Sequence, residues 1–143
     1  MHVMQFTRAK AGLSSVFDQV ERSGPVVVKR AKSAPVALVR EDQLRELLAR
    51  EFAFSTSTSR AEDGTVSIWL EQFGIYGRGS SIAEAAEDLL DEVEEYVEEW
   101  EEGLGAAPNH RQRAWWVARV QMAEDRDQLR DVIFATPGAS TPA

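Results

Sequence analysis

The sequence predicts an α+β protein with two small modules, residues 1–50 and 51–105, followed by a helical segment at residues 106–143. Two observations predict this class. Residues 1–50 combine helically spaced apolar positions with short β-branched runs, and residues 51–105 place alternating strands ahead of one long amphipathic helix. A third observation, the uneven division of charge, indicates that the two modules meet different partners.

The first module opens with a short apolar strand that ends before Thr7. We expect the Thr7 side chain to cap a helix with one apolar stripe, formed by Ala9, Leu13, Val16, Phe17 and Val20. Gly24 and Pro25 should end this helix, because glycine accepts a left-handed backbone and proline cannot continue a helix.

A hairpin and a second helix complete this module. Residues 26–28 and 35–39 are β-branched runs around the basic stretch 29–34, which predicts two strands joined by a cationic loop. Glu41 and Asp42 bring negative charge to the start of a helix whose buried side we expect to be Leu44, Leu47 and Leu48. The predicted order is β-α-β-β-α.

This pattern resembles the Phd/YefM ("prevent-host-death") antitoxins of type II toxin-antitoxin systems. The resemblance lies in the helix start at 7–14, the turn at 20–25, and the strand residues 28–30 and 35–39, about a third of the chain. It implies a dimer that binds its own operator through the first helix and the hairpin tip, with Lys10 and Arg30 at positions where the family carries basic DNA contacts. The chain departs from the family at Arg40, where a hydroxyl cap is usual, and in continuing with a second folded region.

The basic residues of the first module also favour nucleic acid on chemical grounds. The leading candidates are Arg8, Lys10, Arg30 and Lys32. Arg8 and Lys10 are expected in the first helical turn, where backbone donors favour phosphate, and a two-fold dimer would double each contact. The alternative is that these charges only solvate the surface.

Charge is segregated along the chain. Residues 1–50 carry nine Lys and Arg against five Asp and Glu, a net charge of +4, while residues 51–107 carry two against fifteen, a net charge of −13. Residues 108–143 carry five against four. Only the first module is therefore expected to approach a polyanion, and the second has either a solvated acidic face or a cationic partner.

The sequence of the second module predicts three strands and a helix. Phe52 and Phe54 lie in an extended run from Glu51 to Thr58, residues 65–71 alternate so that Val66, Ile68 and Leu70 share a face, and residues 73–79 form a third strand. Ser81 and Glu84 form a predicted capping box for the helix. Its apolar stripe is Ile82, Ala86, Leu89, Leu90, Val93, Tyr96, Val97 and Trp100, and Gly103 and Gly105 end it.

This order resembles the HicB-type partial RNase H fold over about residues 51–103, with a signature at Gly77, Gly79, Ser81, Glu84 and Ala85. In that family the module neutralises an RNA-cleaving toxin. HicB proteins usually place a DNA-binding element after this module, whereas here a Phd-like element precedes it.

The C-terminal segment predicts short amphipathic helices. Pro108 suits a first helical turn, and Trp115 and Trp116 are followed by the apolar positions Leu129 and Phe134. These four side chains are either core or the contact surface for a toxin, and both alternatives stay open. Residues 137–143 are expected to be a frayed tail.

No catalytic or metal centre is expected. The chain has no cysteine, and His2 and His110 lack a second histidine at ligand spacing and are expected at the surface. Glu62, Asp63, Asp88 and Glu92 are the only carboxylates suited to RNase H chemistry, but they fit a polar surface better. We therefore expect no enzyme activity, no cofactor, no membrane span and a cytoplasmic location.

Together these observations predict an antitoxin that neutralises a toxin, expected to be a ribonuclease, and represses its own operon by binding DNA. The alternative is a stand-alone transcriptional regulator whose second module senses a signal or oligomerises. A homodimer is expected, and a higher-order assembly with the toxin is left open.

Overall fold

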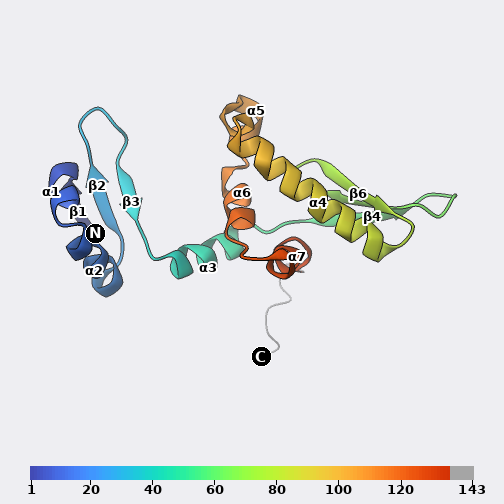
Figure 1. Cartoon of the computed structure of the whole chain (residues 1–143), viewed down its shortest axis with the longest axis horizontal. Coiled ribbons are helices and arrows are strands. Elements are labelled where there is room, and N and C mark those ends of the chain that lie inside the picture. The colour runs from blue at the N-terminus through green and yellow to red at the C-terminus, as the bar shows by residue number, and fades with distance from the viewer. Residues whose placement is uncertain (136–143) are drawn as a thin grey trace. The chain divides into compact units, whose positions relative to one another are not determined.

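The computed structural model describes residues 1–135 and divides into two compact units, Met1–Leu47 and the chain from Leu48 onward. The predicted α+β class is confirmed, since each unit contains one small sheet with helices packed on it. Figure 1 shows the elements of both units in chain order.

The N-terminal unit contains β1 (His2–Gln5), α1 (Phe6–Ala11), α2 (Leu13–Ser23), β2 (Val26–Lys29) and β3 (Val36–Leu38). Its strand order is β1-β2-β3, with β1 parallel to β2 and β2 antiparallel to β3. A parallel pair needs a crossover connection, and here α1 and α2 supply it. The predicted β-α-β-β order is therefore present, with the hairpin between β2 and β3 in the predicted place (Figure 1).

Two details of the first predicted helix were wrong. The helix is broken at Gly12 into α1 and α2, and the residue before α1 is Gln5, so Thr7 lies inside the helix and caps nothing. The predicted apolar stripe is also only partly buried: Leu13 is 51% exposed and Phe17 is 55% exposed. The buried core of this unit is correspondingly small and consists of Ala9, Val16, Val20 and Val26.

Helix α3 (Glu41–Glu51) begins with the predicted acidic residues. Its apolar side differs from the prediction, because Leu48 is buried while Leu47 is 47% exposed. The boundary between the two units lies between these two residues. The helix also continues through Glu51, so the extended run expected from Glu51 to Thr58 is wrong at its start.

The second unit contains β4 (Thr56–Arg60), β5 (Val66–Leu70) and β6 (Ile75–Gly79) in an antiparallel sheet of order β4-β5-β6. The long helix α4 (Ile82–Glu101) follows and runs back along β6 (Figure 1). Val66, Ile68 and Leu70 are buried, which confirms the predicted inward face of β5. Helix α4 packs mainly on β6 and less on β5.

Two glycines of β6 allow α4 to approach closely. A Cβ on Gly77 would lie 2.2 Å from the carbonyl oxygen of Ala85, and one on Gly79 would lie 2.5 Å from Glu84 Cβ. The Ser81 hydroxyl accepts a hydrogen bond from the Glu84 N–H (3.1 Å), as predicted, but the Glu84 carboxylate accepts from Ser80. The predicted capping box is thus shifted by one residue on its return bond.

The C-terminal helices cover the rest of this core. They are a short 3₁₀ turn η1 (Leu104–Ala106), α5 (Pro108–Arg111), α6 (Ala114–Gln121) and α7 (Arg126–Phe134). Pro108 occupies the predicted first turn of α5. Val117, Leu129 and Ile133 are buried in the same core as α4 and the sheet. Within residues 1–135, no helix is long and apolar enough to cross a membrane. The predicted tail at 137–143 lies outside the described residues.

Candidate nucleic-acid interface and partner surface

All four predicted DNA-contacting residues are exposed in the N-terminal unit, but only two of them line one groove. Lys10 and Arg30 lie on the groove of about 490 Å³ between α1, α2 and the hairpin. The Arg30 guanidinium sits 5.4 Å from the centre of the Phe6 ring and donates to the Ser33 hydroxyl at 3.3 Å. These contacts hold Arg30 over α1. Arg30 and Lys10 therefore project from the same side of the unit.

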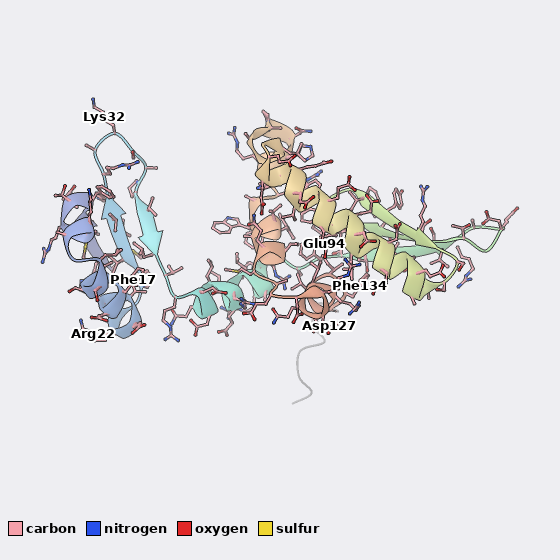
Figure 2. The ribbon with its side chains drawn as sticks, viewed as in Figure 1. Phe17, Arg22, Lys32, Glu94, Asp127 and Phe134 are labelled. Atoms are coloured by element: carbon pink, nitrogen blue, oxygen red, sulfur yellow. The ribbon has the colours of Figure 1, made fainter. Side chains whose placement is uncertain are left out.

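The remaining two cations lie apart from this groove. Arg8 lines a separate hollow with Ser15 and Gln19. Lys32 is at the tip of the hairpin loop, as Figure 2 shows, where its φ of 65° places it in the left-handed region. Helix α1 has only six residues, so Arg8 lies in its first turn as predicted, whereas Lys10 lies only in its last turn, where backbone donors do not favour phosphate. The sequence reasoning did not select Lys29, which is exposed at the end of β2 beside Arg30.

The N-terminal unit leaves much of its apolar surface exposed. Its core has four buried residues, while several larger side chains remain open to solvent. These are Val3, Phe6, Leu13, Phe17, Val36 and Val39, with exposed fractions between 39% and 63%. Phe17, labelled beside α2 in Figure 2, borders a shallow hollow with Leu38 and Val39. Such a surface is typical of a unit completed by another chain.

The four predicted toxin-contacting residues have two different environments. Leu129 is 4% exposed and belongs to the core, and Trp116 and Phe134 are partly buried against that core. Trp116 Nε1 donates to the carbonyl of Ala53 at 3.1 Å, which fixes its ring. Only Trp115 is widely open, with 50% of its surface exposed.

Trp115 therefore forms the exposed part of an aromatic cluster. Its ring centre lies 6.3 Å from that of Phe52, and Phe52 meets Trp116 edge-on at 5.0 Å. The Arg119 guanidinium donates to the Phe52 carbonyl at 2.9 Å and lies 5.7 Å from the Phe54 ring, and burial lowers the pKa of Arg119. Hydrogen bonds from Trp116 and Arg119 thus hold residues 52–53 to α6, and Trp115 lies beside Phe52.

His110 has a structural role that sequence reasoning missed. Its Nδ1 lies 3.0 Å from the Tyr96 hydroxyl and 3.2 Å from Arg113 Nη1, and Arg113 also donates to the Phe73 carbonyl at 3.1 Å. Because an arginine can only donate, Nδ1 of His110 accepts the Arg113 hydrogen bond. This cluster fastens the α5–α6 connection to α4 and to the turn between β5 and β6, which is a different role from the surface position expected for this histidine. No signal in the sequence pointed to it, since the residues are up to 40 positions apart.

The acidic face of α4 is partly neutralised by α7. Arg126 contacts Glu87, Asp91 and Glu94 at 2.9–3.1 Å, and Arg130 pairs with Glu87. Burial lowers the pKa of Arg126, but the hydrogen bonds that Arg126 donates to these carboxylates outweigh it and raise that pKa above its usual value. Hydrogen bonds from Arg130 and then Arg126 lower the pKa of Glu87. Glu94 on α4 and Phe134 on α7 are labelled in Figure 2.

The four carboxylates considered for RNase H chemistry do not form one centre. Asp63 accepts the Thr65 N–H in the β4–β5 turn, a bond that lowers the Asp63 pKa, and Asp88 accepts the Arg78 N–H on β6. Within residues 1–135, no three side chains of metal-ligating type converge on one point.

The sequence and the fold both match antitoxins. The sequence model of the family PHD_like, described as "Antitoxin of toxin-antitoxin, RelE / RelB, TA system", matches residues 1–135. Among solved structures, the antitoxin part of a proposed toxin/antitoxin system from Syntrophomonas wolfei subsp. wolfei has a similar fold, with a TM-score of 0.79 and 21% sequence identity. That likeness covers 94% of this chain and 97% of the other. No curated protein matches the chain.

Proposed function

The chain belongs to the PHD_like family of antitoxins of toxin-antitoxin systems, and from this premise we propose that it neutralises a cognate toxin and represses its own operon. In this proposal the N-terminal unit is a Phd/YefM-like, DNA-binding homodimer, and residues 51–105 are a HicB-like module that restrains a ribonuclease. The chain itself performs no catalysis. The family match does not favour the alternative of a stand-alone regulator.

The groove that carries both Lys10 and Arg30 is the observation that best supports DNA binding. Two exposed cations project there from separate elements, α1 and the hairpin, and Lys29 and Lys32 add charge along the same hairpin. Phosphate contacts of this kind supply most of the affinity of a small module for DNA and make it depend on salt.

The test of DNA binding is a salt titration on the operator region upstream of the chain's own gene. Lys10→Ala should weaken binding and reduce the slope of log K against log salt by about 1. Arg22→Ala is the matched control, because Arg22 is exposed at the end of α2, outside the groove, and bonds back to its own helix. An equal effect of both variants would refute the placement of the interface, and no binding by the wild type would refute the DNA-binding function.

The exposed apolar side chains of the N-terminal unit support the homodimer. Phe17 lies outside the Lys10 and Arg30 groove with 55% of its surface exposed, so Phe17→Glu should split the dimer without disturbing the core. Sedimentation of the full chain measures this. A variant that sediments like the wild type would remove Phe17 from the dimer contact.

Trp115 is the best candidate for a toxin contact, because it is aromatic, half exposed and packed beside Phe52. Trp115→Ala should weaken binding of the protein encoded beside this gene by about tenfold or more, as loss of an aromatic anchor does. Arg111→Ala on neighbouring α5 is the control, since Arg111 is also exposed and lies outside the aromatic cluster. Unchanged affinity in the Trp115 variant would exclude this surface.

A further inference from the structure

The two edges of the second sheet are protected very differently. At β6, the Arg78 N–H donates to the Asp88 carboxylate of α4 at 2.8 Å, and α4 lies against Gly77 and Gly79. At the opposite edge, all five residues of β4 are exposed. The sequence there is Thr-Ser-Thr-Ser-Arg, with no proline and a single charge at its end. Edge strands usually carry more protection against pairing than this.

The pairing of β4 with β5 shows which backbone groups face outward. Glu71 N donates to Ser55 O, and Ala61 N donates to Thr65 O, so the odd-numbered residues of this segment bond to β5. In an antiparallel pair the bonding direction alternates along the strand. The N–H and C=O groups of Thr56, Thr58 and Arg60 therefore point away from the sheet, and no described side chain or loop bonds to them.

We propose that this edge pairs with β4 of a second copy of the chain, antiparallel and centred on Thr58, to join two sheets into one of six strands. This register uses all three outward-facing residues: Thr58 lies opposite Thr58 of the second copy, and Thr56 lies opposite Arg60. No two arginines face each other, and cross-strand threonine pairs are favourable.

Charge decides between a second copy and a cationic protein as the occupant. Strands β4, β5 and β6 contain Arg60 and Arg78 but no Asp or Glu, whereas α4 carries ten acidic residues between 82 and 101 and packs mainly on β6. Two copies joined at β4 thus meet through a strand that carries no acidic residue. A basic partner, in contrast, would find no acidic group on β4.

The test uses the absence of cysteine from the sequence, because a single introduced cysteine then reports one contact. In the proposed register, Thr58 and its symmetry mate form a hydrogen-bonded pair with Cα atoms about 5.5 Å apart, within the range that a disulfide spans. Full-length Thr58→Cys should form a disulfide-linked dimer under mild oxidation at least about tenfold faster than the control Ser57→Cys. In that control the two cysteines are diagonal neighbours about 7–8 Å apart, which is too far for a disulfide.

A second variant tests the proposed register of the two β4 strands. In Ser57→Cys/Ser59→Cys each cysteine lies opposite the other type in the second copy, so this double variant should also cross-link faster than Ser57→Cys alone. Circular dichroism should show that all variants keep the wild-type fold, since the substituted side chains are exposed. If neither Thr58→Cys nor the double variant cross-links faster than Ser57→Cys, the proposal is overturned. The open edge of β4 would then be available for pairing with a strand of a different protein.

Discussion

Gly77 gives the most direct test of how α4 is held on the second sheet. The change is Gly77→Ala. An alanine Cβ would lie 2.2 Å from the Ala85 carbonyl oxygen and 2.4 Å from the Leu89 N–H nitrogen, and both of these are backbone atoms that no side-chain rotation can move. Ordinary contacts are more than an ångström longer, so α4 must shift away from β6.

The cost follows from what this shift disrupts. Leu89 and Val93 of α4 are fully buried against the sheet, and overpacking of a well-filled core costs up to about 3 kcal/mol. For a unit of this size that loss lowers Tm by roughly 15 °C. Gly79→Ala should destabilise this unit as well, because its Cβ would lie 2.5 Å from Glu84 Cβ and 2.7 Å from the Ala85 backbone nitrogen, and no side-chain rotation moves either atom.

Tryptophan fluorescence reports this unfolding selectively, since all four tryptophans follow Leu48. Gly12→Ala in the N-terminal unit is the control: its φ is −128°, its Cβ would be 3.8 Å from the nearest atom, and the tryptophan transition should not move. A Gly77→Ala variant that unfolds within about 0.5 kcal/mol of the wild type would refute the close contact between α4 and β6.

Two further predictions concern the contacts that fasten the C-terminal helices. Because hydrogen bonds from Arg130 and Arg126 hold the Glu87 pKa below its ordinary value of 4.5, the stability this carboxylate contributes is complete above pH 4.5 and is lost as the pH falls through the lower folded pKa. Wild type should therefore be more stable than Glu87→Gln in urea at pH 7, and the difference should vanish in acid; a difference that stays constant with pH would contradict the assignment. Trp116→Phe keeps the aromatic contact but leaves the Ala53 carbonyl without its donor, so it should cost about 1–2 kcal/mol by urea unfolding. A variant as stable as the wild type would show that this hydrogen bond is dispensable.

Local sequence signals determined most of the elements. Glycine and proline at 24 and 25 ended α2 as predicted, and Ser81 capped α4, because these effects depend on a few neighbouring residues. Strict alternation in β5 predicted its buried face, since a strand has only two faces and one was apolar. The confirmed α+β class and the antitoxin family rest on such ordered local patterns.

Exposure was decided by tertiary structure instead. Helical spacing places Leu13 and Phe17 on an apolar stripe, but the break at Gly12 and the small sheet leave about half of each side chain exposed. The two adjacent tryptophans show the same limit: Trp116 is fixed by a carbonyl 63 residues earlier, while Trp115 faces solvent. Periodicity gives the side of a helix on which a residue lies, but it does not say which distant segment covers that side.

The sequence likewise identified the charge of the candidate DNA surface but not which of its residues lie together. Counting charges identified a basic first module, because net charge needs no coordinates. Bringing Lys10 and Arg30 to one groove, while sending Arg8 to another, required the crossover of α1 and α2 beside the hairpin. The contacts of His110 with Tyr96 and Arg113, and of Arg126 with α4, join residues far apart in the chain, and only the folded arrangement brings their donors and acceptors within bonding distance.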